Sequence, residues 1–319
     1  MTPGAASARA GGDAVPLNPP ARVPDALLEA PEATRALLPR DEGFVEDEAG
    51  VRVFYEVYGD SPDTVCLLPP WAITSSRGWR GQIPYLGRHF RVLAIDPRGN
   101  GRSDRPREPA AYSRAAHVRD VLRVLDATGT ERAAMVSISP RASLALALAV
   151  GHPERVTAAV FITPQLWVEE DFLRPFIAGR RERYEGMDRL NPHHWNADFR
   201  GFAEWFARWT APRPHSTRQI EETVRHALAA GAEGLFPSTI GFEMYERAEA
   251  LDLARRVRCP VLVTQNGGEA MYPKHTSGAL AEATGGRLHV FDGLGPLVGA
   301  RWPVAMNLVL REFLETVRG

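Results

Sequence analysis

The sequence predicts an α/β fold in which a mostly parallel sheet is covered by helices on both faces. Two observations lead to this prediction. Short apolar or alternating runs, typical of strands, recur along the chain, and segments of helical length and periodicity separate them. Strands that are joined through helices pair in parallel and bury both faces of the sheet. The expected strands are 51–58, 64–68, 91–95, 133–136, 157–162, 259–264 and 287–291, and the expected helices are 114–126, 143–150, 275–283 and 304–317.

The first half of the pattern starts with an alternating strand at 51–58, followed by two short apolar runs at 64–68 and 91–95. The segment 114–126 is amphipathic, because its apolar residues recur at helical spacing on one face. These apolar residues are Val118, Leu122 and Leu125. We therefore expect three strands and then a helix that packs on the sheet.

The second half continues with a buried strand at 133–136, a helix at 143–150 and a strand at 157–162. After residue 245 the same alternation resumes and ends with the helix at 304–317. Both halves therefore contribute to one sheet.

The intervening segment 165–245 differs, because strand signals disappear there and aromatic residues gather. These aromatic residues are Trp167, Trp195, Phe202, Trp205, Phe206 and Trp209. A helical insertion is the simplest account. We divide the chain into a flexible N-terminal arm at 1–41, which begins with an aperiodic stretch rich in Ala, Gly and Pro, a core at 42–164 and 246–319, and the insertion at 165–245.

Composition excludes several classes of function. The 38 basic and 39 acidic residues leave a formal net charge of −1, so the chain lacks the long-range field that attracts nucleic acids. No stretch approaches the roughly 20 apolar residues that cross a bilayer, and the N-terminus has no uninterrupted apolar leader, so we expect a soluble cytoplasmic protein without a membrane partner.

Cys66 and Cys259 lie in apolar, strand-like contexts and are expected to be free buried thiols.

Several local sequences resemble the α/β-hydrolase family, and the likeness extends from Glu42 to Arg318. They are LLPPW, AIDPRGNGRSDRP, AAMVSISPRASLALALAVGHPERV, PVLVTQNGGEAMYP and HVFDGLGP. In the family these segments hold, in order, an oxyanion-hole turn, a structural loop, the nucleophile elbow, the catalytic acid and the catalytic histidine. The resemblance implies an α/β-hydrolase fold with a helical cap at 165–245.

The resemblance places Ser139 at the nucleophile position of the elbow. The family pattern G-x-S-x-G reads Ser137-Ile138-Ser139-Pro140-Arg141 here, so both glycines are replaced. A hydroxyl that merely caps the following helix is the alternative interpretation. Pro140 has no backbone N–H to donate to an oxyanion, and the loss of one such donor costs ~3 kcal/mol of transition-state stabilisation.

The other positions of the site also depart from the family. Pro69 and Pro70 replace the usual His-Gly of the oxyanion turn, whereas Trp71 still offers an N–H there and either lines the pocket or only packs beside it. Glu269 matches the catalytic acid, although an isolated loop glutamate is as often simply solvated. Pro296 stands where the family has its histidine, and the loss of such a base can cost on the order of 10⁶ in rate.

We looked for a substitute histidine. His193 and His194, next to Trp195, are the candidates expected in the insertion, and two adjacent histidines without a third ligand do not make a metal site. The predicted catalytic residues are Ser139 and Glu269. The predicted substrate-binding residues are Trp71, Ile138, Pro140, Trp167, His194, Trp195, Trp205, Trp209 and Pro296. No metal or cofactor is expected.

The sequence therefore favours an enzyme that acts on a small apolar metabolite without hydrolysis, by cyclisation, elimination or isomerisation, with Glu269 as its base. Bacterial secondary metabolism is a plausible setting by resemblance alone. A serine esterase or acyl-transfer enzyme with a base from the cap is one alternative. A non-catalytic protein that binds a ligand in the same pocket is another. Oligomeric state stays open.

Overall fold

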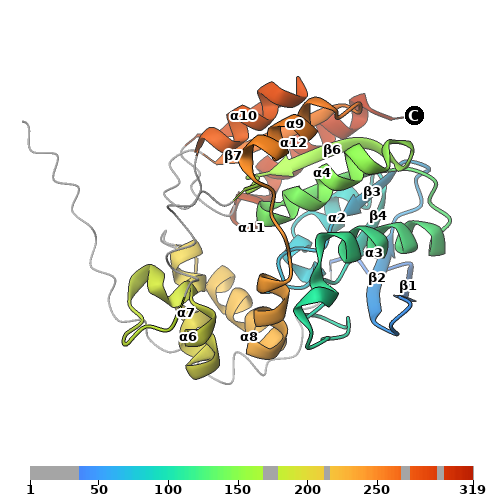
Figure 1. The fold of residues 1–319 in the computed structure, drawn as a ribbon. Coiled ribbons are helices and arrows are strands. Elements are labelled where there is room, and N and C mark those ends of the chain that lie inside the picture. Colours follow the sequence, from blue (N-terminus) through green and yellow to red (C-terminus); the bar gives the residue numbers. More distant parts are fainter. Residues whose placement is uncertain (1–35, 168–178, 212–215, 267–273, 293–297, 319) are drawn as a thin grey trace, which may run out of the picture.

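A computed structural model of the protein describes residues 36–167, 179–211, 216–266, 274–292 and 298–318. Its eight strands form one sheet in the order β1-β2-β4-β3-β5-β6-β7-β8 (Figure 1). The strands are β1 (Asp41–Glu46), β2 (Arg52–Tyr58), β3 (Thr64–Leu67), β4 (Arg91–Ile95), β5 (Ala133–Ile138), β6 (Val156–Ile162), β7 (Val261–Asn266) and β8 (Arg287–Phe291). The predicted fold class is confirmed.

Most strand pairs are parallel, and only β2 runs against its neighbours β1 and β4. Strand β1 was not expected, because its sequence DEGFVE is largely exposed and carries no clear alternation. Asp41, assigned to the N-terminal arm, instead begins this strand. Strands β5 and β7 end two residues later than predicted, at Ile138 and Asn266, and so extend further toward the site.

The sheet separates two apolar cores, because neighbouring residues of a strand point to opposite faces. In β4, Leu93 and Ile95 join the core under α3, α4, α9 and α10, whereas Val92 and Ala94 join the core under α2 and α12. These helices are α2 (Ile83–Leu86), α3 (Arg114–Ala127), α4 (Ala142–Gly151), α9 (Arg247–Arg255), α10 (Lys274–Thr284) and α12 (Pro303–Thr316), and α11 (Val298–Arg301) precedes α12. Both faces of the sheet are therefore covered by helices, as expected.

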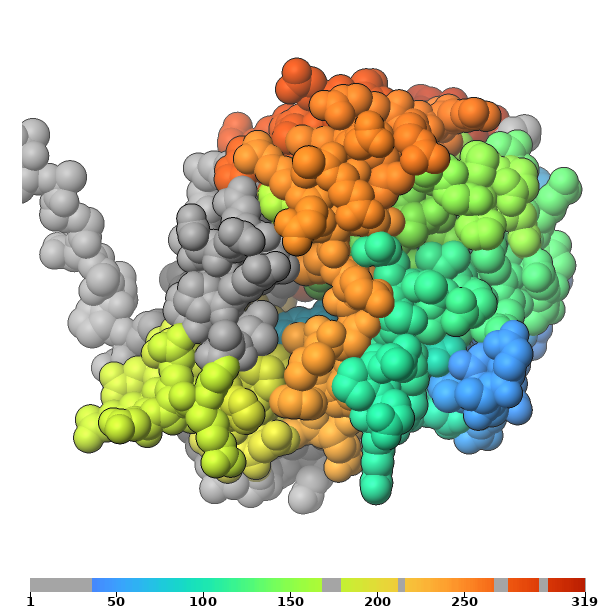
Figure 2. All heavy atoms as spheres, viewed as in Figure 1, coloured from blue at the N-terminus to red at the C-terminus, as the bar shows by residue number. Residues whose placement is uncertain are grey.

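The segment between β6 and α9 carries α6 (Pro192–Ala197), α7 (Phe199–Thr210) and α8 (Thr217–Ile240), which lie together to one side of the sheet (Figure 1). Helix α8 is interrupted at Gly231, whose φ of 67° is left-handed. From its end, residues 241–246 return to the sheet as a strip at the molecular surface (Figure 2). The division of the chain into separate core and cap domains stays a prediction.

The loop after β4, Asp96 to Asp104, joins the sheet, the segment after β3 and helix α8. The Asp96 carboxylate accepts hydrogen bonds from the backbone N–H groups of Ser76 and Arg102, each at 2.8 Å. The Asn100 side chain donates to the carbonyl oxygens of Ala72 at 2.9 Å and of His226 at 3.0 Å. These contacts give the loop the structural role that the sequence assigned to it.

Arg98, in the same loop, is a buried cation with a full set of partners. Its guanidinium donates to both carboxylate oxygens of Asp120 at 2.6 Å, to Asp47 at 2.8 Å and to the carbonyl of Ala111 at 2.9 Å. The side chain is only 1% exposed. A buried ion pair of this kind is sensitive to the loss of one partner, because the remaining charge is left without compensation.

Both cysteines are free thiols, as predicted, but only Cys66 is buried, whereas Cys259 is half-buried. Within the described ranges, every helix is too short or too polar to cross a bilayer. A cytoplasmic location stays a prediction.

Removal of the Arg98 cation tests the role of this loop in stability. We expect Arg98→Met to lower the free energy of unfolding by about 3–5 kcal/mol, because it strands the buried carboxylate of Asp120. Urea denaturation followed by circular dichroism measures the change. The control Arg132→Met, at an exposed position, should stay within about 0.5 kcal/mol of the wild type. Equal stability of the two variants would contradict the prediction.

Candidate active site

Ser139 lies on a sharp turn between β5 and α4. The strand ends at Ile138, Ser139 has a φ of 54°, and α4 begins three residues later at Ala142. A left-handed conformation costs a non-glycine residue roughly 1–2 kcal/mol, so the turn holds Ser139 in a strained conformation. The N-cap of α4 is Arg141, not Ser139, which argues against the helix-capping interpretation.

The position of this turn in the sheet favours ligand binding. Strand β3 lies between β4 and β5, so the chain leaves the carboxyl ends of β3 and β5 toward opposite sides. Ligands of open α/β sheets bind in the crevice at such a switch point. Pro70 and Trp71 follow β3, Ser139 follows β5, and Thr163, with a φ of 45°, follows the next strand, β6.

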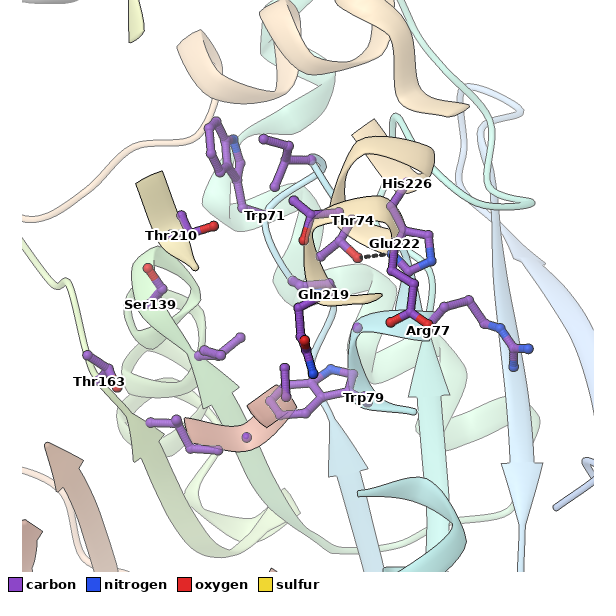
Figure 3. A pocket seen from close by; sticks show the side chains of 18 of the residues that line it. Trp71, Thr74, Arg77, Trp79, Ser139, Thr163, Thr210, Gln219, Glu222 and His226 are labelled. Carbon is purple, nitrogen blue, oxygen red and sulfur yellow. Dashed lines mark hydrogen bonds between the residues drawn. The ribbon is translucent and has the colours of Figure 1, made fainter. Parts of the chain in front are cut away.

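A cavity of about 200 Å³ lies at this point (Figure 3), and its walls are mostly apolar. The sheet side contributes Pro70, Trp71, Ile73, Thr74, Ile138, Ser139, Pro140, Ile162, Thr163 and Asn266. The helices of the insertion contribute Phe206, Thr210, Gln219, Glu222, Thr223 and His226. The remaining lining residues are Arg77, Gly78, Trp79, Arg80, Gln82, Val298, Gly299 and Ala300.

One wall of the cavity is polar and is formed by the first half of α8. Gln219, Glu222 and His226 follow one another at helical spacing and line the cavity together. His226 Nδ1 lies 2.8 Å from the Thr74 hydroxyl, which is the dashed contact in Figure 3. In that view, Ser139 and His226 lie at opposite ends of the drawn side chains.

Glu222 carries the negative charge of this wall. It forms ion pairs with Arg80 and with Arg218, the latter at 3.0 Å. Burial lowers the pKa of Arg80, whereas the charge of Glu222 opposes that shift. The carboxylate is therefore neutralised from two sides, and the wall presents hydrogen-bonding groups more than net charge to the cavity.

Trp71 is fixed against the insertion. Its indole N–H donates to the Thr239 hydroxyl at 2.9 Å, and its ring meets Phe206 edge-on with the centroids 5.5 Å apart. Trp71 and the preceding residue, Pro70, both line the cavity. In the described ranges, no group of three or more His, Cys, Asp or Glu side chains is placed to hold a metal ion.

The chain matches the family described as alpha/beta hydrolase fold over residues 64–298, which is most of its length. The chain belongs to the α/β-hydrolase family. In this α/β-hydrolase, the turn at Ser139 follows β5, and the helices α6, α7 and α8 lie between β6 and α9.

Individual relatives agree with this assignment. The α/β-hydrolase is 30% identical over 269 residues to a protein from Variovorax paradoxus named "Putative carbamate hydrolase RutD", with 82% of this chain and 96% of the relative covered. An enol-lactonase from Burkholderia xenovorans has a similar structure, with a TM-score of 0.65, 21% identity, and 86% of this chain and all of that chain covered. A hydrolase from Pseudomonas aeruginosa gives a TM-score of 0.66 at 23% identity, with 86% and 98% covered.

The structure brings part of the predicted site together. Trp71, Ile138, Ser139 and Pro140 all line the cavity. The predicted acid Glu269 and the predicted pocket residue Pro296 lie outside the described residues, so their roles stay predictions.

The aromatic residues expected from the insertion lie elsewhere. Trp195 is 1% exposed and packs against Phe202, with the ring centroids 4.7 Å apart, inside the core of the insertion. Trp205 and Trp209 stack on each other at the edge of that core. None of these three tryptophans belongs to the described lining of the cavity; Phe206, from the adjacent helical position, does.

Two further expectations also need correction. Trp167 packs in the core beneath α4 and α9 and forms a bridge with Tyr245, away from the cavity lining. His194 stacks on Tyr184 with the ring centroids 5.0 Å apart and does not line the cavity. His226, which the sequence analysis did not select as a candidate, is the histidine of the described lining. The helical spacing of Gln219, Glu222 and His226 was the signal that could have identified it.

The strained turn at Ser139 makes a testable prediction about stability. Ser139→Gly should be more stable than Ser139→Ala by about 1 kcal/mol, because glycine adopts positive φ without a steric penalty. Ser143, inside α4, provides the matched control, where the alanine variant should be the more stable by a similar amount. Thermal and urea unfolding measure both pairs. The same order at both positions would mean that Ser139 is not strained.

Proposed function

We propose that this α/β-hydrolase-fold enzyme carries out non-hydrolytic chemistry on a small, largely apolar molecule held in the cavity. Cyclisation, elimination and isomerisation are the reaction types that fit. The observation that carries the proposal is the turn itself: Ser139 keeps its strained position at the cavity, but the next residue is Pro140, which has no N–H.

The physical argument concerns the oxyanion. Acyl transfer to a serine creates a negatively charged tetrahedral intermediate, and the residue after the nucleophile normally donates one of its hydrogen bonds. Proline at this position removes that donor. Proline at 296 in the sequence removes the histidine of the family pattern as well. In the family pattern, that histidine is the base that activates the serine hydroxyl.

The cavity still offers groups that can bind a molecule and move a proton. The apolar walls favour a molecule with little polar surface. The Thr74–His226 pair provides a hydroxyl and an imidazole in contact, and an imidazole can accept or donate a proton near neutral pH. Ser139 would then orient the ligand by hydrogen bonding. Participation of Glu269 as a base and a setting in bacterial secondary metabolism remain parts of the proposal.

Hydrolysis is the second candidate, and one observation favours it. The relatives compared above carry names of hydrolases, including a carbamate hydrolase and an enol-lactonase. In that case His226, rather than His193 or His194, is the candidate base among the described residues, because it lines the cavity; it would have to act across the cavity from Ser139.

A fluorophosphonate probe separates the two candidates. We expect the wild-type protein to resist the probe, because an unactivated serine loses on the order of 10⁶ in reactivity. Intact-protein mass spectrometry detects the adduct, and hydrolysis of a p-nitrophenyl acyl ester gives a second measurement. Rapid stoichiometric labelling of Ser139 would overturn the proposal in favour of a hydrolase, and His226→Gln would then test the base.

A gain-of-function variant controls for access to Ser139. The double variant Pro140→Ala with Pro296→His supplies the two groups that the family pattern contains. We expect this protein to react with the probe at Ser139 and the triple variant with Ser139→Ala to remain unlabelled. If the double variant is labelled and the other two proteins are not, Ser139 is accessible to the probe, and the wild type lacks only the backbone N–H at position 140 and the imidazole at position 296.

A further inference from the structure

Arg141 is a buried cation with free hydrogen-bonding capacity directly after the turn at Ser139. It stands two residues after Ser139, at the last glycine position of the elbow pattern, and its side chain is 1% exposed. Its Nε donates a long hydrogen bond of 3.4 Å to the carbonyl of Pro70. Both terminal nitrogens are buried and have no hydrogen-bond partner, and no carboxylate in the described part of the chain pairs with them.

The contrast with Arg98 shows how unusual this is for the protein. Arg98 is equally buried, and its guanidinium reaches two carboxylates and a carbonyl. A charge that is removed from water without a partner costs several kcal/mol. The pKa of Arg141 reflects this, since burial lowers it to about 9, which still leaves the group charged at neutral pH.

The surroundings of Arg141 compensate for only part of this cost. The guanidinium lies over the ring of Phe242, 4.0 Å from its centroid, and such a contact contributes about 2 kcal/mol when desolvated. The ring of His117 also contacts Phe242, with the ring centroids 5.5 Å apart. Burial, together with the charge of Arg141, holds the pKa of this imidazole well below its ordinary value. The neutral imidazole therefore supplies no counter-charge.

Two more polar atoms in this region are buried without a partner. They are Nε2 of His117 and the hydroxyl of Tyr112, whose rings lie 6.5 Å apart. Buried polar groups in folded proteins are nearly always satisfied, by protein, water or ligand. The two terminal nitrogens of the Arg141 cation indicate that something negative belongs beside them. The neutral His117 has its Nδ1 3.2 Å from the Ser113 carbonyl, so its Nε2 is an acceptor that needs a donor instead.

We propose that Arg141 is the receptor of a small monovalent anion, best matched by a carboxylate group. The two terminal nitrogens of a guanidinium fit the two oxygens of a carboxylate in a bidentate arrangement. Arg141 bonds to Pro70 and follows Pro140, and both prolines line the cavity. Arg141 itself lies behind these prolines and is not part of the described lining. The carboxylate is then either a free anion from solution or the acidic group of a molecule that extends from the cavity past the two prolines. The proposal does not depend on the reaction proposed above.

Thermal unfolding in sodium formate tests the site. At constant ionic strength, formate should raise the Tm of the wild type, because a ligand that binds only the native state stabilises it. Arg141→Met should lose this response. In buffer without small anions, the variant should be at least as stable as the wild type, because methionine removes an unpaired buried charge.

The Arg98→Met variant is the matched control, since it removes an equally buried arginine that already has partners. It should begin at a lower Tm but keep the rise with formate. An identical response to formate in the wild type and in Arg141→Met would overturn the proposal. A lower Tm of Arg141→Met in anion-free buffer, together with no response of the wild type, would overturn it as well.

A series of carboxylates distinguishes the two sources of the anion. If the site receives the acidic group of a molecule in the cavity, butyrate and phenylacetate should bind more tightly than formate, and Phe206→Ala should weaken only the larger two. If it receives a free anion, chloride and formate should bind best, and Phe206→Ala should have no effect. Either result supports an anion at Arg141.

Crystals of the wild-type protein in sodium bromide provide a test without any variant. We expect an anomalous peak in contact with the terminal nitrogens of Arg141. The absence of bromide at that position, at concentrations that occupy other surface sites, would overturn the proposal.

Discussion

The hydrogen bonds of the Asp96 carboxylate fix the loop that connects the two walls of the cavity, the segment after β3 and helix α8. One oxygen fixes the backbone of Ser76, just after the segment that carries Trp71 and Thr74, and the other closes the loop at Arg102. Asn100, inside the same loop, then bonds to the carbonyl of His226 on α8. Because one loop contacts both walls, the distance between them depends on a few buried hydrogen bonds.

The site combines a retained backbone shape with altered chemistry. The left-handed conformation of Ser139 and its place at the switch point of the sheet are what the α/β-hydrolase fold needs to present a nucleophile. Pro140 preserves that shape, since a proline ring needs no N–H and favours the tight turn that follows, but it removes an oxyanion donor. The geometry of the turn and its reactivity are therefore separable, and fold membership alone does not define the reaction.

Features that depend on the local sequence could be predicted, whereas features that depend on how helices pack against each other could not. Central strands such as β4 are buried on both faces, so their apolar runs are clear in the sequence, whereas the exposed edge strand β1 carries no such signal. Trp71 and Ser139 each follow a strand by only a few residues, so the sequence indicates that they lie at the same edge of the sheet, where both line the cavity. Residues of the insertion depend on how α7 and α8 tilt, and a rotation by one position exchanges Trp205 for Phe206 at the cavity.

The break in α8 at Gly231 separates a half that lines the cavity from a half that packs against the loop after β4. The residues before it face the cavity with Gln219, Glu222 and His226, whereas Gly234, after it, lies so close to Gly99 that a Cβ atom there would clash with the Gly99 carbonyl. The second half is therefore fixed by this close approach, whereas the first half is held by the bond from Asn100 to the carbonyl of His226. Substitutions on the cavity side of the first half can reshape the cavity for a different molecule, while the packing of the second half against the loop stays in place.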